Sequence, residues 1–178
     1  MNNIESFILS TLSATVRAGT PLLFAVLGTI FTERSGVMNL GLEGLMLVGA
    51  IGGFVASYQT SNLLLAILVA MLAGAVLGLV HAFFTVTLRV NQIVSGLAIT
   101  MLGTGLSGLW GRDYIGVIAK RFQPIRIPVL SDIPYLGQIL FSHDLLVYIS
   151  FLLVPVMWFF IYKTRPGLTL RAVGESPD

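Results

Sequence analysis

The chain of 178 residues contains no cysteine, which excludes disulfide bonds and thiol chemistry. It also lacks the pattern GxxxxGK[ST], so we expect it to bind no ATP itself. No cluster of His, Asp or Glu has the spacing of metal ligands, and no Ser/His/Asp set suggests hydrolysis. We therefore expect no metal, no cofactor and no catalytic residue. A chain of this kind is a conduit, whose energy must come from an ion gradient or from a partner.

Charged residues are scarce, at 10% of the chain against about 25% in ordinary soluble domains. Hydrophobic residues make up 56%, and residues 44–88, 90–111 and 145–162 carry no Asp, Glu, Lys or Arg. A helix needs about 20 apolar residues to cross the hydrocarbon core, so the first of these runs is long enough for two crossings. A soluble core could absorb one such helix but hardly the series. The pattern predicts an all-α integral membrane protein.

We predict five transmembrane helices. They cover about residues 8–31, 36–57, 63–88, 91–111 and 145–162. Pro21 and Pro155 fall inside two of them, which is tolerated because neighbouring groups re-satisfy the freed carbonyl. The first five residues include Glu5 and lack the basic start of a signal peptide, so we expect insertion to rely on the first helix.

Two polar segments flank the last predicted helix. Residues 112–144 contain three prolines, which predicts a folded loop with extended pieces. Residues 163–178 are too polar to span a membrane. If this tail is cytoplasmic, five crossings place the N-terminus outside. The inner segments then hold five Lys or Arg residues and the outer loop four, which by count alone is nearly a tie, but the inner ones lie in short segments close to helix ends, where the positive-inside rule operates best. We expect residues 112–144 to be extracytoplasmic and residues 163–178 to be cytoplasmic.

Glu43 lies in an apolar setting with Asn39, Gly41 and Gly44 nearby. A charge at the centre of a membrane costs about 2.5–3.5 kcal/mol, so such a residue usually faces a bundle interior or a water-filled path. One reading places Glu43 and Asn39 on a substrate pathway. The other places Glu43 near the interface, where it caps a half-helix or pairs with Arg34. Both readings remain open.

Polar residues also open the fourth predicted helix. Asn91, Gln92 and Ser95 could line a channel for a polar solute, or they could be interface residues beside Arg89, and we favour the interface while keeping them as pathway candidates. His81 in the third helix fits a hydrogen bond between helices better than a proton relay. The spacing of small residues favours helix packing at two glycine pairs: Gly49 with Gly53, and Gly74 with Gly78.

Two stretches carry a family resemblance. They are ERSGVMNLGLEGLMLVGA at residues 33–50 and TRPGLTLRAVGESP at residues 164–177. They resemble the permease subunits of binding-protein-dependent ABC importers for branched-chain amino acids, ribose and nucleosides. The ERSGVMNLGLEG form, with NQIVSGLAI and IPVLSDIPYLG between the two stretches, is most similar to the nucleoside or simple-sugar branch. Members of this family are usually longer and have several more helices, so we expect a fragment that forms the N-terminal part of one permease domain over residues 1–178.

The resemblance implies that the tail couples to an ATPase. It points to Gly167, Arg171, Gly174 and Glu175 as coupling residues in a cytoplasmic segment. We expect Pro166 and Gly167 to turn the chain, Gly174 to interrupt the following strip, and Ser176 to cap a further helix.

The implied function is import of a nucleoside, or next a simple sugar, across the plasma membrane. The implied partners are an ATP-binding subunit, a second homologous permease subunit, an extracytoplasmic solute-binding lipoprotein and membrane lipid, with no nucleic acid. The main alternative is a secondary transporter that uses an ion gradient through Glu43 or His81. A membrane-embedded enzyme or structural subunit is a third possibility, but it lacks any reactive constellation.

Overall fold

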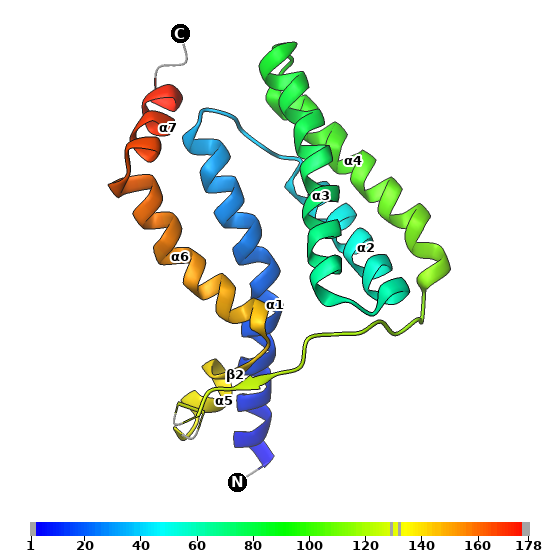
Figure 1. Ribbon diagram of the computed structural model, residues 1–178, viewed down its shortest axis with the longest axis vertical. Coiled ribbons are helices and arrows are strands. Elements are labelled where there is room, and N and C mark those ends of the chain that lie inside the picture. The colour runs from blue at the N-terminus through cyan, green and yellow to red at the C-terminus, as the bar shows by residue number, and fades with distance from the viewer. Residues whose placement is uncertain (1–2, 129, 132, 176–178) are drawn as a thin grey trace. The chain divides into compact units, whose positions relative to one another are not determined.

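The computed structural model describes residues 3–128, 130, 131 and 133–175, and these are mostly helical (Figure 1). Five helices are long and apolar enough to cross a membrane, which confirms the predicted number and the all-α class. They are α1 (Asn3–Arg34), α2 (Leu42–Thr60), α3 (Leu63–Ala82, continued by the π-helical turn η1, Phe83–Thr87), α4 (Gln92–Gly111, continued by the 3-10 turn η2, Arg112–Tyr114) and α6 (Leu145–Lys163). The chain is a multi-pass membrane protein.

The C-terminal end of α1 explains one error in the predicted boundaries. Gly36 has a φ of +85°, a left-handed conformation that glycine adopts without steric cost. The N–H of Gly36 donates to the carbonyl of Glu33 (3.0 Å), and the N–H of Val37 donates to the carbonyl of Thr32 (3.1 Å). These two bonds form a Schellman motif, which ends a helix. The prediction that the second helix begins at residue 36 was therefore wrong, because α2 begins only at Leu42.

Three of the spanning helices begin with a side-chain cap. In each case a side-chain oxygen accepts hydrogen bonds from two backbone N–H groups of the first turn, which would otherwise lack partners. The capping residues are Asn62 for α3, Asn91 for α4 and Asp144 for α6.

The chain divides into two compact units. One comprises Met1–Gly28 with Phe122–Arg171, and the other comprises Thr29–Arg121 with Ala172–Asp178. In the second unit, α2 packs against both α3 and α4 (Figure 1). The boundary falls inside α1, so that this helix contributes to both units. A single permease domain over residues 1–178 stays a prediction.

Small residues bring α2 and α3 together. A Cβ atom added at Gly49 would lie 3.2 Å from the carbonyl oxygen of Ala70, and one added at Gly53 would lie 3.1 Å from the Cβ of Ala70. These contacts confirm the packing role predicted for that pair. The prediction for the second pair was wrong at Gly78, where an added Cβ would meet no described atom within 4 Å.

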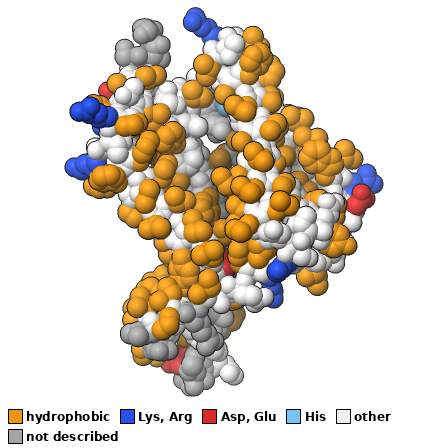
Figure 2. Space-filling model, in the orientation of Figure 1, with side chains coloured by type: hydrophobic (Ala, Val, Ile, Leu, Met, Phe, Trp, Pro, Cys, Tyr) orange, Lys and Arg blue, Asp and Glu red, His pale blue; other side chains and the backbone are white. Residues whose placement is uncertain are grey.

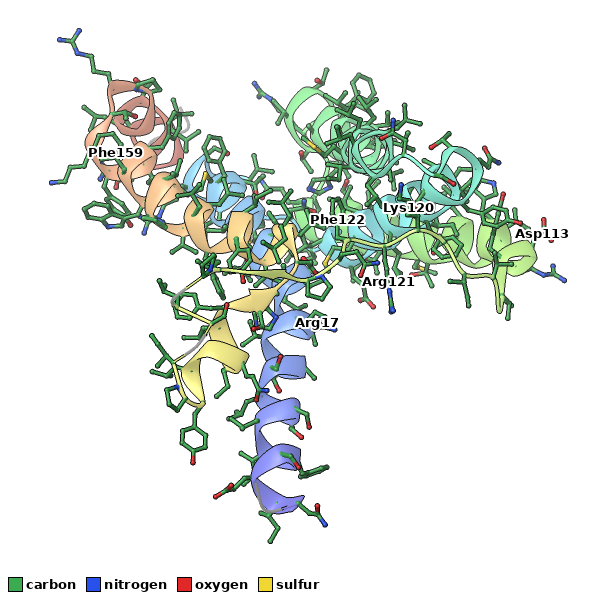
Figure 3. The ribbon with its side chains drawn as sticks, turned by 60° about the horizontal axis from the view of Figure 1, so that its bottom comes forward. Arg17, Asp113, Lys120, Arg121, Phe122 and Phe159 are labelled. Carbon is green, nitrogen blue, oxygen red and sulfur yellow. The ribbon has the colours of Figure 1, made fainter. Side chains whose placement is uncertain are left out.

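The connection between α4 and α6 is folded and partly extended, as predicted. Strand β1 (Ile125–Arg126) pairs antiparallel with strand β2 (Ser142–His143), and the short helix α5 (Leu136–Leu140) lies between them in sequence. In Figure 3, Asp113, Lys120 and Arg121 follow one another along the chain after α4. The hydroxyl of Ser57 in α2 donates to the carbonyl oxygen of Lys120 (2.8 Å), which holds this part of the connection to the second unit.

The surfaces of the spanning helices are apolar. Figure 2 shows hydrophobic side chains over most of the visible face, with most Lys and Arg side chains at its margins. Large hydrophobic side chains of α3 are more than half exposed, including Leu64, Leu68, Met71, Leu72, Val76 and Leu79. Such a surface is stable in lipid, where it needs no protein cover.

Candidate solute-pathway and coupling sites

Residues 36–41, which we call the 36–41 segment, form a non-helical stretch between α1 and α2. Three of its carbonyl oxygens, at alternate residues, are hydrogen-bonded to side chains of α3 and α4. Gly36 accepts from Nε2 of Gln92 (3.4 Å), Met38 interacts with Nε2 of His81 (3.3 Å), and Leu40 accepts from Oγ1 of Thr100 (3.0 Å). Non-helical backbone within a membrane is tolerated only where protein or water satisfies it. These polar side chains supply that satisfaction.

Gln92 holds the segment at two points. Besides its bond to Gly36, its Oε1 accepts a hydrogen bond from the N–H of Met38 at 2.7 Å. One amide side chain therefore satisfies a donor and an acceptor of the same backbone stretch. Because Gln92 is the first residue of α4, this contact ties the segment to the start of that helix.

His81 links three elements and is almost fully buried, with 3% of its surface exposed. Its Nδ1 lies 3.0 Å from Oγ of Ser95 in α4, and its Nε2 faces the carbonyl of Met38. A carbonyl can only accept, so in the neutral ring Nε2 carries the proton and Nδ1 accepts from the Ser95 hydroxyl. The hydrogen bond between helices that the sequence favoured is present. Both ring nitrogens are engaged within the protein, which weakens the reading of His81 as a proton relay.

Glycines let α4 approach the 36–41 segment and α2 at backbone distance. A Cβ added at Gly96 would lie 2.9 Å from the backbone nitrogen of Leu40, and one at Gly44 would lie 2.8 Å from the Cα of Thr100. A Cβ added at Gly41 would lie 2.8 Å from the Ile99 side chain. Any larger residue at these three positions would push the elements apart. Gly41 and Gly44 therefore serve close packing beside the candidate pathway residues.

The remaining polar candidates also make local contacts. Oδ1 of Asn39 accepts the N–H of Gly41 at 2.9 Å, just before α2 begins. Among the described residues, no atom accepts a hydrogen bond from the Nδ2 of Asn39, and the side chain is half-buried. Oδ1 of Asn91 accepts the N–H groups of Ile93 (2.9 Å) and Val94 (3.3 Å) as the cap of α4. Asn39 and Asn91 thus each use Oδ1 to hold the backbone near the start of a helix.

Glu43 lies in the first turn of α2 and is exposed. A carboxylate in this position interacts favourably with the positive end of the helix dipole. Its place in the first turn is the one expected of a half-helix cap, and its exposure is the one expected of a side chain that faces a path or a partner. Among the described residues, no group of three His, Asp or Glu side chains is arranged to hold a metal.

The predicted coupling residues lie in one short helix, α7 (Arg165–Glu175). Its N-cap is Thr164, whose Oγ1 accepts the N–H of Gly167 at 3.2 Å. The predicted turn at Pro166 and Gly167 was therefore wrong, because the chain turns at Thr164 and Pro166 lies in the first helical turn, where its missing N–H leaves no bond unmade. The predicted interruption at Gly174 was also wrong, since that residue is helical. The predicted cap at Ser176 lies outside the described residues.

Gly167 and Arg171 face the end of α6. A Cβ added at Gly167 would collide with the carbonyl of Phe160 and lie 2.8 Å from the carbonyl carbon of Ile161. The guanidinium of Arg171 lies 5.2 Å from the ring centroid of Tyr162, a cation–π distance. Its Nε is buried and has no hydrogen-bond partner among the described atoms.

The other end of α7 contacts the turn after α1. A Cβ added at Gly174 would collide with the carbonyl oxygen of Arg34 and lie 3.1 Å from the nitrogen of Gly36. Glu175, the last residue of the helix, is exposed. Two of the four coupling candidates, Gly167 and Gly174, are therefore glycines at backbone contacts.

The sequence profile of the family described as the permease component of the branched-chain amino acid transport system matches residues 11–178. The chain belongs to this family. The expected resemblance is thus confirmed. No solved structure matches this family member.

Three curated relatives of this permease-family chain carry transport names. A protein of Haloferax volcanii, named provisionally as a glucose ABC transporter permease, is 42% identical over 97% of the chain and 54% of its own length. A guanosine ABC transporter permease of Bacillus subtilis is 39% identical over 92% and 55%. A nucleoside ABC transporter permease of Lactococcus lactis is 36% identical over 89% and 54%. The chain spans about half the length of the curated relatives it matches.

Sequence reasoning missed three residues of the arrangement. Thr100 holds the carbonyl of Leu40, and Gly96 and Gly103 provide the surface of α4 against which the 36–41 segment and α2 pack. The spacing of Gly96, Thr100 and Gly103 at four and then three residues places them on one helical face. This spacing could have predicted from the sequence that this face of α4 packs against another element.

Proposed function

We propose that this chain forms membrane-spanning permease structure in an ABC importer. It has no catalytic role, and a separate ATP-binding subunit supplies the energy. The observation that carries the proposal is the identity of 36–42% to three proteins named as ABC transporter permeases, over 89–97% of this chain. The second homologous permease subunit, the solute-binding lipoprotein and the location in the plasma membrane are parts of the same proposal.

The proposed solute is a nucleoside, with a simple sugar second and a branched-chain amino acid third. Two of the relatives are named for guanosine or nucleosides and one for glucose. Glucose and guanosine each contain a sugar ring that bears several hydroxyl groups. The Nδ2 donor of Asn39 and the carboxylate of Glu43 suit hydrogen bonds to such hydroxyls. Asn91, Gln92 and Ser95 would then shape the wall by fixing the backbone beside the path.

The proposed topology places the N-terminus and residues 112–144 outside, and residues 163–178 inside. It is supported by the five candidate spans that precede α7. In this arrangement α7 lies at the cytoplasmic surface, where Gly167, Arg171, Gly174 and Glu175 would couple to the ATPase. Within its own unit, each glycine would hold its end of α7 against backbone, Gly167 against α6 and Gly174 against the turn after α1.

The test of this function is co-purification followed by binding. The permease, carrying an affinity tag, is expected to bring down an ATP-binding protein and a lipoprotein. The isolated lipoprotein is expected to bind guanosine. Tight binding of leucine without any nucleoside binding would overturn the solute ranking, and purification without an ATPase would favour the gradient-driven alternative.

A further inference from the structure

The end of α7 and the start of the candidate pathway meet at one turn. Gly174 contacts the backbone of Arg34 and Gly36, and a Cβ added at Gly36 would lie 3.3 Å from the Cα of Gly174. Contacts this close join two backbones without flexible side chains between them. Movement of the α7 end must therefore displace the turn after α1 or separate from it.

The turn leads directly into the 36–41 segment. Gly36 is held by the Schellman bonds on one side and by Nε2 of Gln92 on the other. Two residues later, Met38 is held by Oε1 of Gln92 and by His81. The segment then reaches Asn39, whose Nδ2 is the proposed solute donor. From Gly174 to Asn39 the path is short and consists of backbone that is held at defined points.

These contacts differ in how firmly they bind. The α2 side is packed tightly, because Gly44 meets the backbone of α4 and Gly41 meets the Ile99 side chain. The hydrogen bond from Gln92 to Gly36 is long, at 3.4 Å, against 2.7 Å for the bond between Gln92 and Met38. A displacement that begins at Gly36 would thus be transmitted to Met38 through the Gln92 side chain, while the Gly41 end stays fixed.

We propose that the 36–41 segment is the mechanical link between α7 and the solute path, and that Gln92 and His81 are positioning residues that transmit its displacement to Asn39. This inference rests on the proposed function, because it requires α7 to be moved by an ATPase. In this proposal, movement of α7 displaces Gly36 through the contact at Gly174. Gln92 positions the backbone of the 36–41 segment and does not contact the solute.

The test measures guanosine uptake and ATP hydrolysis together in the assembled transporter, in proteoliposomes. Glucose replaces guanosine if the lipoprotein binds glucose. The variants are Gly174→Ala, Gln92→Ala and the two combined. The matched control is Gly105→Ala, because a Cβ there meets no described atom within 4 Å. Each test variant is expected to lower the uptake per ATP hydrolysed by about fivefold or more, the lower range of coupling between sites. The control should leave the ratio unchanged.

Two further results separate a link from other roles. The double variant is expected to match the more impaired single variant within about twofold, because both substitutions interrupt one path. Gln92→Glu keeps the acceptor for the N–H of Met38 but has no donor for the carbonyl of Gly36, so it is expected to lower the ratio as Gln92→Ala does.

Several outcomes would overturn the link. They are multiplied effects in the double variant, a raised KM for the solute at an unchanged ratio in Gln92→Ala, or loss of assembly in that variant. Absence of any ATP-dependent uptake by the unaltered transporter would instead contradict the proposed function itself.

Discussion

Gly44 of α2 and Gly103 of α4 cross so closely that a Cβ atom added at Gly103 would lie 2.6 Å from the carbonyl carbon of Gly44. The obstacle is backbone, so a rotamer change cannot relieve it. This crossing fixes the distance between α2 and α4, and hence the space in which the 36–41 segment packs. The stability of the unit therefore depends on the absence of a side chain at these two positions.

Gly103→Ala is expected to destabilise the protein by about 1–3 kcal/mol or more, the range for overpacking a tight core. Gly105→Ala, on the same helix but facing open space, is the matched control and should have little effect. Thermal unfolding of the two variants in detergent measures the difference. Equal unfolding temperatures would show that α2 and α4 do not cross at these glycines.

The hydrogen bond between His81 and Ser95 predicts that substitutions of the two residues destabilise the protein to different extents. His81→Ala leaves the buried Ser95 hydroxyl without its partner, at about 1–3 kcal/mol for a buried group left unpaired, and it also removes the partner of the carbonyl of Met38, a residue that is itself exposed. Ser95→Ala should cost less, because His81 keeps its contact with Met38. Thr104→Val is the control, since among the described residues the Thr104 hydroxyl donates to the carbonyl of Thr100 in its own helix.

A double-mutant cycle on the same pair tests whether the tie is real. The two substitutions are expected to be non-additive by about 0.5–3 kcal/mol, as for residues in one hydrogen-bond network. Additive effects would mean that the imidazole and the hydroxyl do not interact in the membrane.

The sequence predicted the spanning helices but not the non-helical 36–41 segment. Charge-free runs gave the number and approximate positions of the five spanning helices, because burial of apolar surface in lipid decides them. Residues 36–41 were wrongly included in the second helix, because they are as apolar as the residues of the helix that follows. The left-handed turn at Gly36 ends α1 before this segment, and amino-acid composition does not reveal that conformation.

The candidate site was predicted in part. The polar residues Asn39, Gln92 and Ser95 were recognised because each is unusual in an apolar stretch. The contacts of Gln92 with the 36–41 segment and of Ser95 with His81 depend on which helices pack together, and hydropathy does not reveal this. Among the first residues of α7, Pro166 and Gly167 were predicted to be a turn because they usually disfavour helix. A helix forms there because Thr164 caps its first turn.

Glu43→Ala is expected to lower solute uptake beyond any fall in membrane abundance. The physical reason is that an exposed carboxylate beside Asn39 is costly in a membrane unless it faces a path or a partner. Glu5→Ala is a suitable control, because Glu5 is also an exposed acid in the first turn of a helix. Normal uptake at normal abundance in Glu43→Ala would reduce Glu43 to a helix cap.

Topology is open to direct labelling, because the chain has no native cysteine. Ser61→Cys lies between α2 and α3, Thr169→Cys lies in α7, and both positions are exposed. An impermeant thiol reagent is expected to label the first in intact cells and the second only after permeabilisation. Labelling of position 169 from outside would invert the proposed orientation.

The central claim is that ATP hydrolysis by a partner drives solute through this permease. The most direct measurement is guanosine uptake into proteoliposomes that contain the purified transporter and its lipoprotein, with ionophores present to collapse ion gradients. We expect uptake that requires ATP and persists without any gradient. Uptake that follows an imposed ion gradient and ignores ATP would contradict it.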